Sequence, residues 1–259
     1  MLQVSGTMTQ VPVVTDQEAE EIDRLLTTEQ GLSLLDKVEV AGRALAETVR
    51  QMLAGSERGK YIIVLAGVGD NGAAGMAAVR RLHEAGAEVR LVLSARPDHL
   101  HEMAAHQYAI LQKMGIEGWG LSLDQETMAQ QEPIAWTSAD LIVDAIFGSG
   151  LEGEPRGEAA ELIRLANASR LPILAFDLPS GLCGDEGTIQ SPCTDATATL
   201  TLTLPRRAHA EGWPVVGELW IADTGATSDL YERLGFHVGD LYRGRAVISL
   251  GSARKLKYP

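Results

Sequence analysis

The sequence is short of several residue types, and each shortage excludes a class of protein. Only two cysteines, Cys183 and Cys193, occur in 259 residues, too few for a disulfide framework, so we expect reduced thiols. Basic residues number 22 against 35 acidic ones, and the net charge of −13 makes nucleic acids and anionic membrane surfaces poor partners. No apolar run approaches the roughly 18 residues of a membrane-spanning helix, and the N-terminus lacks the pattern of a signal peptide. We therefore expect a cytoplasmic protein.

The sequence also lacks the usual patterns of zinc sites: it has no C-x-x-C, no H-E-x-x-H and no clustered histidines. Apolar residues are plentiful, at 45% of the chain, which is enough for a sizeable core. No linker-like change in composition, internal repeat or low-complexity segment divides the sequence. We therefore expect one domain over residues 1–259, with a loose arm at 1–14 and a C-terminal tail of uncertain structure at 240–259.

Helical and strand-like patterns alternate along most of the chain. Two helices are predicted first, because Thr15 to Glu18 is typical of a capping box and Ser33 to Asp36 of a second helix start. Strands are then predicted at 62–66, 88–93, 140–147, 172–176, 196–204 and 218–222, and helices up to 86 and at 98–114, 158–167 and 227–234, with a short helix near Gln125. This order predicts an α/β fold: a three-layer αβα sandwich with a Rossmann-like, mainly parallel sheet and two N-terminal helices.

A glycine-rich turn follows the first predicted strand. Gly67, Gly69 and Gly72 match the G-x-G-x-x-G dinucleotide fingerprint, in which bare N–H groups and a helix N-terminus attract anionic groups. The acidic residue expected about 20 positions later is absent. A plain packing turn is therefore an equal alternative. An NADP-dependent oxidoreductase is a further alternative, supported only by Arg96 at the end of the second strand.

Polar residues stand at the ends of three predicted strands: Asp70 and Asn71 after the first, Asp144 at the end of another, and Asp177 with Ser180 after a third. Ligands of open α/β sheets bind beyond the carboxyl ends of the strands, so we expect these residues to share a site. Amide, carboxylate and hydroxyl oxygens suit an alkali or alkaline-earth cation. Asp177 is then available for proton transfer, and we expect burial to raise its pKa toward the working range.

Four stretches resemble motifs of one known family. Residues 67–75 read G-V-G-D-N-G-A-A-G and resemble G-P-G-N-N-G-G-D-G, and residues 144–157 resemble D-A-L-F-G-T-G-L-x-G-x-x-R-G. Residues 176–182 resemble V-D-I-P-S-G-L, and residues 39–42 are similar to M-E-x-A-G. The sequence thus resembles the NAD(P)H-hydrate epimerases, the YjeF N-terminal domain family, in a stand-alone form without a dehydratase domain.

The resemblance implies a Rossmann-like homodimer that interconverts R- and S-NAD(P)HX at C6, for repair by a separate dehydratase. It implies that Asp177 is the catalytic acid/base, and that Asn71, Asp144 and Ser180 bind a potassium ion. The implied substrate-binding residues, besides Asp177, lie on two loops: Asp70, Asn71, Gly72, Ala73, Ala74, Gly148, Ser149, Gly150, Leu151, Glu152, Gly153 and Glu154.

The chain departs from the family pattern in the glycine loop, at Asp70, Ala73 and Ala74. It also reads Pro-Arg-Arg at 205–207, where the family often has a lysine, which makes Arg206 the candidate replacement. A second hypothesis follows from these changes: a catalytically inactive family member that acts as a ligand-binding or protein-interaction module.

Overall fold

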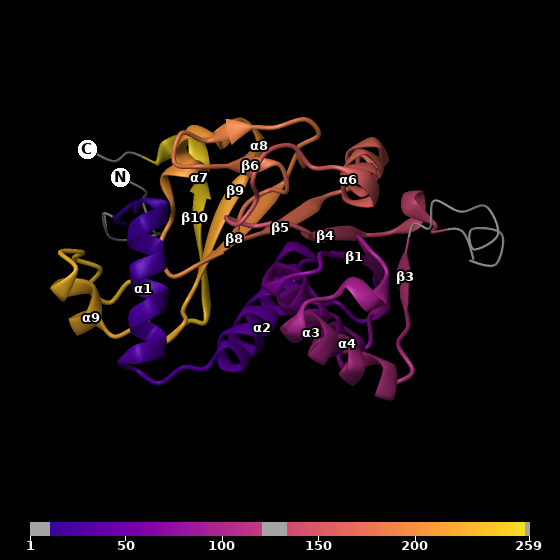
Figure 1. Cartoon of the computed structure of the whole chain (residues 1–259), viewed down its shortest axis with the longest axis horizontal. Helices are drawn as coiled ribbons and strands as arrows, with labels where there is room; N and C mark the ends of the chain where they lie inside the picture. Colours follow the sequence, from indigo (N-terminus) through magenta and orange to yellow (C-terminus); the bar gives the residue numbers. More distant parts are fainter. Residues whose placement is uncertain (1–10, 121–133, 257–259) are drawn as a thin grey trace.

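One mainly parallel sheet runs through the molecule in the computed structural model, which describes residues 11–120 and 134–256. In these ranges the strand order is β10-β9-β8-β5-β4-β1-β2-β3 (Figure 1). Within this sheet, as far as the structure describes it, β10 alone is antiparallel to its neighbour. The strands are β1 (Tyr61–Ala66), β2 (Glu88–Leu93), β3 (Gly118–Gly120), β4 (Leu141–Ala145), β5 (Ile173–Phe176), β8 (Ala198–Leu202), β9 (Glu218–Ala222) and β10 (Val247–Ser252), with a separate hairpin of β6 (Leu182–Cys183) and β7 (Thr188–Ile189).

Helices cover both faces of the sheet, as Figure 1 shows. They are α1 (Asp16–Thr28), α2 (Leu34–Met52), α3 (Asp70–Glu84), α4 (Glu102–Lys113), α6 (Gly157–Ser169), α7 (Arg207–Glu211), α8 (Trp213–Val216) and α9 (Ser228–Arg233), with 3-10 turns η1 (Pro97–His99), η2 (Trp136–Ser138) and η3 (Ala253–Lys255). Along β1, Ile62 and Val64 pack with α2, α3 and α4, whereas Ile63 and Leu65 pack with α6 on the opposite face. Because side chains alternate along a strand, an all-apolar strand serves both layers. The three-layer sandwich is confirmed.

The helix starts follow the sequence pattern. Thr15 and Ser33 each cap a helix, and in both cases the residue three positions on, Glu18 or Asp36, completes a capping box. The helix predicted at 98–114 is wrong at its start: α4 begins at Glu102, after the turn η1 and an extended residue, because the backbone N–H of His101 bonds to the Val68 carbonyl (2.8 Å).

Other boundaries were wrong or incomplete. Residues 11–14 do not form a loose arm, because Val14 is fully buried and bridges to Arg206. The tail contains the edge strand β10, an apolar run that flanking basic residues obscured in the sequence. The short strand β3 was not predicted. The helix expected near Gln125 lies outside the described residues, and one domain over residues 1–259 stays a prediction.

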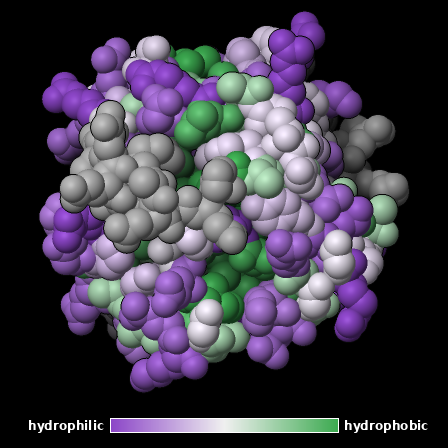
Figure 2. Space-filling model, turned by 90° about the vertical axis from the view of Figure 1, so that its right-hand side faces the viewer, coloured by the Kyte–Doolittle hydropathy of each residue, from purple (hydrophilic) through white to green (hydrophobic). Residues whose placement is uncertain are grey.

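The chain runs outward from β1 to β2 and β3, then returns to place β4 on the other side of β1. This change of direction leaves a crevice between the helices at the carboxyl ends of β1 and β4. At the β3 edge, hydrophilic residues lie mainly around the rim, and the most hydrophobic residues gather in a strip down the middle of this face (Figure 2). Within the described ranges, none of the helices combines the length and apolar composition that a membrane crossing requires.

Candidate active site

The three strand ends that carry polar residues are neighbours in space. β4 lies between β1 and β5, and Asp144 is in register with Leu65 of β1 and Ala175 of β5. The carboxyl ends of parallel strands meet at one edge of a sheet, so the loops after β1, β4 and β5 converge there. The structure thus brings the three polar strand ends together at one edge of the sheet, while a shared site stays a prediction.

Asp144 and Ser180 form a fully buried pair at this edge. The Ser180 hydroxyl donates to Asp144 Oδ1 (2.7 Å), and the Ser180 backbone N–H donates to Oδ2 (2.9 Å). The N–H of Phe147 in turn donates to Ser180 Oγ (2.9 Å). Burial raises the pKa of Asp144, although these hydrogen bonds oppose the rise. Among the described residues, Asp144 therefore has hydrogen-bond donors around it but no cationic partner, so its ionised form would be a costly buried negative charge.

Asn71 lies on the same edge, half-buried, in the first turn of α3. Its amide nitrogen donates to the Phe176 carbonyl (3.3 Å), which ties the glycine turn to the end of β5. A methyl group added at Gly148 would come within 3.0 Å of Asn71 Oδ1, so the loop after β4 passes directly over the amide. Asn71 thus faces the loop that follows Asp144, while the described contacts join only Asp144 and Ser180 directly.

Asp177 follows β5 and has a left-handed backbone, with φ of 64°. Its Oδ2 accepts from the Ser149 N–H (2.9 Å), and its Oδ1 lies 3.6 Å from Arg206 Nε. Burial raises the pKa of Asp177, but Arg206 and the Ser149 N–H outweigh it, so the pKa lies below its ordinary value. The expected upward shift was wrong: the sequence showed that Asp177 would be buried, but not that a guanidinium would face it.

Arg206 connects the carboxylate to the N-terminal helix. Its Nη1 lies 3.2 Å from Asp16 Oδ1 at the start of α1, and only 16% of its side chain is exposed. The guanidinium therefore lies between two acids, and burial raises the pKa of Asp16 although Arg206 opposes it. Asp16 was not predicted as a site residue, because no local pattern links residue 16 to residues 177 and 206.

A cleft of about 210 Å³, here called the strand-end cleft, opens between α1, α2 and these strand ends. Four predicted site residues line it: Asp70, Asn71, Ala74 and Asp177. Sequence reasoning missed the opposite wall, which α1, α2 and the residues after β8 and β9 supply: Ala19, Asp23, Leu26, Leu34, Lys37, Val38, Ala41, Leu202, Thr203 and Thr224. Ser149 lines an adjoining hollow with Arg206.

The other predicted substrate residues lie in different places. Gly148 packs against Asp177, and Leu151 is half-buried nearby in the loop, but Gly150, Glu152, Gly153 and Glu154 are exposed on the loop between β4 and α6. Ala73 is fully buried in the core beneath α3, and Gly72 is buried as well.

The glycines of the fingerprint serve close backbone packing. A methyl group on Gly67 would lie 1.9 Å from the Ile146 carbonyl oxygen, and one on Gly72 would lie 1.9 Å from the Gly67 carbonyl oxygen. The Gly67 N–H bonds to the Ala145 carbonyl (2.9 Å), so the turn is fastened to the end of β4. These two glycines are therefore explained by packing alone.

Glu39, from the fourth motif, lies outside the strand-end cleft. It pairs with Arg80 and Arg81 of α3 and accepts from Gln107 of α4 (3.0 Å). Burial raises the pKa of Glu39, but Gln107 and the two arginines lower it below its ordinary value. Three residues on, Gly42 allows α2 to approach Ala77 of α3, because an added methyl group would lie 2.5 Å from its Cβ. This motif holds helices together.

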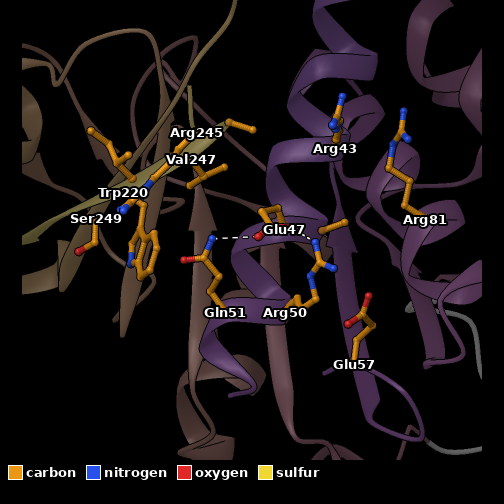
Figure 3. Close-up of a pocket in the computed structure, with 13 residues that line it drawn as sticks. Arg43, Glu47, Arg50, Gln51, Glu57, Arg81, Trp220, Arg245, Val247 and Ser249 are labelled. Atoms are coloured by element: carbon orange, nitrogen blue, oxygen red, sulfur yellow. Dashed lines mark hydrogen bonds and ion pairs between the residues drawn. The ribbon is translucent and has the colours of Figure 1, made fainter. Parts of the chain in front are cut away.

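A second and larger hollow, here called the arginine groove, has a volume of about 720 Å³ and runs between α2 and β10. Figure 3 shows Glu47 of α2 in contact with Arg50 and Gln51 from the same helix. Arg43 and Arg245 also line it, and both are exposed. Arg81 of α3 lines it too and pairs with Glu39 of α2, so ion pairs within and between helices lie at this groove.

Comparisons with known proteins agree with this geometry. Residues 36–208, more than half of the chain, match the family described as YjeF-related protein N-terminus. An NAD(P)H-hydrate epimerase of Dehalogenimonas lykanthroporepellens is 37% identical over 215 residues, which are 83% of this chain and 82% of that protein. A bifunctional NAD(P)H-hydrate repair enzyme of Moorella thermoacetica is 36% identical over 220 residues, 84% of this chain but 41% of that protein. The chain therefore spans less than half of the bifunctional relative.

The fold has a match among solved structures. A crystal structure of yeast ynu0 superposes with a TM-score of 0.77 and covers 92% of this chain and all of that one. Because the two sequences are only 22% identical, this structural likeness supports the Rossmann-like fold and nothing further.

Proposed function

Because this chain belongs to the family of YjeF-related protein N-termini, we propose that it is an NAD(P)H-hydrate epimerase that interconverts R- and S-NAD(P)HX at C6. The observation that carries the proposal is the Asp177 carboxylate, which faces the strand-end cleft and is held by the Ser149 N–H and Arg206. Asp177, Ser149 and Arg206 lie on three separate loops, so the carboxylate is held in one place. A carboxylate held in this way is suited to proton transfer at one position of a bound ring.

The proposed reaction needs one proton to move twice. Because Asp177 is ionised at rest, its carboxylate must first take up a proton from solvent, which it then gives to the C6 hydroxyl. The C–O bond breaks, water departs, and the ring nitrogen lone pair stabilises the ring cation that is left. The resulting carboxylate, whose ionised form Arg206 favours, offsets the positive charge of the ring. Water then adds to the other face of C6 and returns its proton to Asp177, which completes the epimerisation.

We propose that a potassium ion binds beside this carboxylate, at Asn71, Asp144 and Ser180. The support is the fully buried Asp144, whose ionised form would have no cationic side chain beside it among the described residues. Nearby, the buried hydroxyl of Thr194 lowers the pKa of Asp144 yet has no hydrogen-bond partner of normal geometry among the described residues. Such hard oxygen atoms fit an alkali cation. Bound there, the ion would supply positive charge that holds the loops after β1, β4 and β5 together.

A homodimer and functional coupling to a dehydratase stay predictions from the family resemblance. The alternative of an inactive family member is not adopted. Its support was the changes at Asp70, Ala73 and Ala74, but Ala73 packs into the core, and of the two alanines only Ala74 lines the strand-end cleft. Asp70 is exposed at the start of α3, at the edge of the cleft.

The test is the epimerisation of purified R-NADHX and R-NADPHX, followed by chromatographic separation of the epimers with and without potassium. Asp177→Asn should lower the rate about 10²- to 10⁴-fold, the usual contribution of a general acid/base. Glu39→Gln is the matched control, because Glu39 also faces arginines but lies outside the strand-end cleft. A wild-type rate equal to the spontaneous rate would leave the inactive module as the remaining hypothesis.

A further inference from the structure

His209 is a fully buried histidine that no sequence motif singled out. It lies on the short helix α7, immediately after the residues that follow β8. Both ring nitrogens contact backbone atoms of the active site. Nδ1 lies 2.9 Å from the backbone nitrogen of Arg206, and Nε2 lies 2.7 Å from the backbone oxygen of Asp177. The imidazole therefore joins the two residues whose side chains face each other in the strand-end cleft.

These two contacts fix the tautomer of the ring. The backbone N–H of Arg206 is always a donor, so Nδ1 must be the unprotonated acceptor. The proton is then on Nε2, which donates to the Asp177 carbonyl. Burial lowers the pKa of His209 to about 4, so the ring is neutral at physiological pH and keeps this arrangement.

The hydrogen bond to Asp177 acts on an unusual backbone. Left-handed φ values are rare for residues other than glycine, and they persist only where the surroundings enforce them. The Asp177 N–H is fixed by the Leu200 carbonyl of β8 (2.7 Å), and the Asp177 carbonyl is fixed by His209. Both ends of the residue are thus held, and the carboxylate is directed at the Ser149 N–H and Arg206.

We propose that His209 is a positioning residue: its Nε2–H holds the left-handed backbone of Asp177, and its Nδ1 sets the backbone of Arg206, so that the carboxylate and the guanidinium meet in the strand-end cleft. The expected effect on kcat rests on the proposed epimerase function, whereas the expected effect on the backbone of Asp177 does not. His209 itself does not line the strand-end cleft, so its effect passes through Asp177 and Arg206.

Two substitutions by amide side chains test the two hydrogen bonds of His209 one at a time. In His209→Gln, the longer side chain places its amide nitrogen near the position of Nε2, so it preserves donation to the Asp177 carbonyl. In His209→Asn, the shorter side chain places its amide oxygen near the position of Nδ1, so it preserves only the contact with the Arg206 N–H. We expect His209→Asn to lose about tenfold or more in kcat with little change in KM, and His209→Gln to stay within about threefold of wild type, since misplaced catalytic groups lower kcat.

Crystal structures of both variants supply a readout that does not need activity. We expect the positive φ of Asp177 and its contact with the Ser149 N–H to persist in His209→Gln and to be lost in His209→Asn. A His209→Asn protein that keeps both features and the wild-type kcat would overturn the proposal. An equal loss of kcat in both variants, in proportion to the fraction of folded protein, would also overturn the proposal. It would indicate that His209 contributes only to packing.

If a variant does not fold, nitrogen-15 NMR of the wild-type protein tests the proposal through the protonation of the His209 ring nitrogens. The expected spectrum has a protonated Nε2 and an unprotonated Nδ1 for His209 at pH 7. A protonated Nδ1, or an imidazolium ring, would contradict the hydrogen bonds on which the proposal depends. A wild-type protein without epimerase activity would refute the proposed function, and the crystal and NMR results would still test the role of His209.

Discussion

The strand-end cleft and the arginine groove both contain arginines beside carboxylates, but they hold these charges in different ways. In the arginine groove, Glu47 pairs with Arg50 one helical turn away, and the side chains are 29% and 46% exposed. In the strand-end cleft, Asp177 pairs with Arg206 from a separate strand end, and each side chain is only 16% exposed. The groove is the larger of the two, at about 720 Å³ against 210 Å³. Orientation and burial of the charges, rather than the size of the hollow, distinguish the proposed reactive site from the groove.

The largest effect expected from this comparison is a pH-dependent loss of stability through His209. Its folded-state pKa of about 4 lies below the ordinary value of 6.5. Between these two pH values, His209 is protonated in the unfolded chain but neutral in the folded chain. The contribution of His209 to the free energy of unfolding is therefore fully present above pH 6.5. It is lost as the pH falls toward 4, by about 3 kcal/mol in total. Urea unfolding at pH 7 and at pH 4.5 measures it. His209→Gln should remove this part of the slope, and an unchanged slope would contradict it.

Gly148→Ala should damage the cleft without changing any charge. The new methyl group would lie 2.5 Å from Asp177 Oδ2, so the carboxylate must move away from the Ser149 N–H. A displacement of about 1 Å at a catalytic group costs roughly 10²-fold in rate. Epimerase assays of the variant, with circular dichroism to confirm folding, measure the effect. Gly69→Ala is the control, because its methyl group would meet only His101, at 3.8 Å. Equal rates for the two variants would argue against a fixed carboxylate.

Arg206→Met should remove the charge that lies between Asp16 and Asp177. Loss of one member of a largely buried ion pair costs about 1–3 kcal/mol of unfolding free energy after allowance for partial exposure. Burial would then dominate at Asp177 and raise its pKa, so the pH profile of kcat/KM should move to higher pH. Arg206→Lys keeps the charge and should move the profile less. A pH profile of Arg206→Met identical to that of the wild type would show that the guanidinium does not control Asp177.

The smallest effect is expected in the arginine groove. The double variant Arg43→Gln/Arg245→Gln changes two exposed residues that lie away from the strand-end cleft. Surface substitutions of this kind usually change the unfolding free energy by less than about 0.5 kcal/mol. The epimerase rate should also equal that of the wild type. A marked loss of activity would erase the distinction between the two hollows, and would show that the groove takes part in the reaction.

Much of the fold was predictable because it depends on local patterns. The capping boxes at Thr15 and Ser33 follow from side chains three residues apart. The buried strands follow from apolar runs that must be covered on both faces. The antiparallel edge strand β10 was missed, since the flanking basic residues obscured its apolar run. The start of α4 was also missed, because a backbone hydrogen bond to Val68, over thirty residues away, sets it.

The sequence by itself determined the α/β class and the polar residues at the strand ends, because both follow from local pattern, and the family resemblance added Asp177 as the candidate reactive carboxylate. Only the tertiary structure decided the state of that carboxylate. Arg206 lowers the pKa of Asp177, and His209 holds its backbone, yet these residues lie 29 and 32 positions further along the chain. Electrostatic and hydrogen-bond effects depend on distance in space, so no local pattern reveals them.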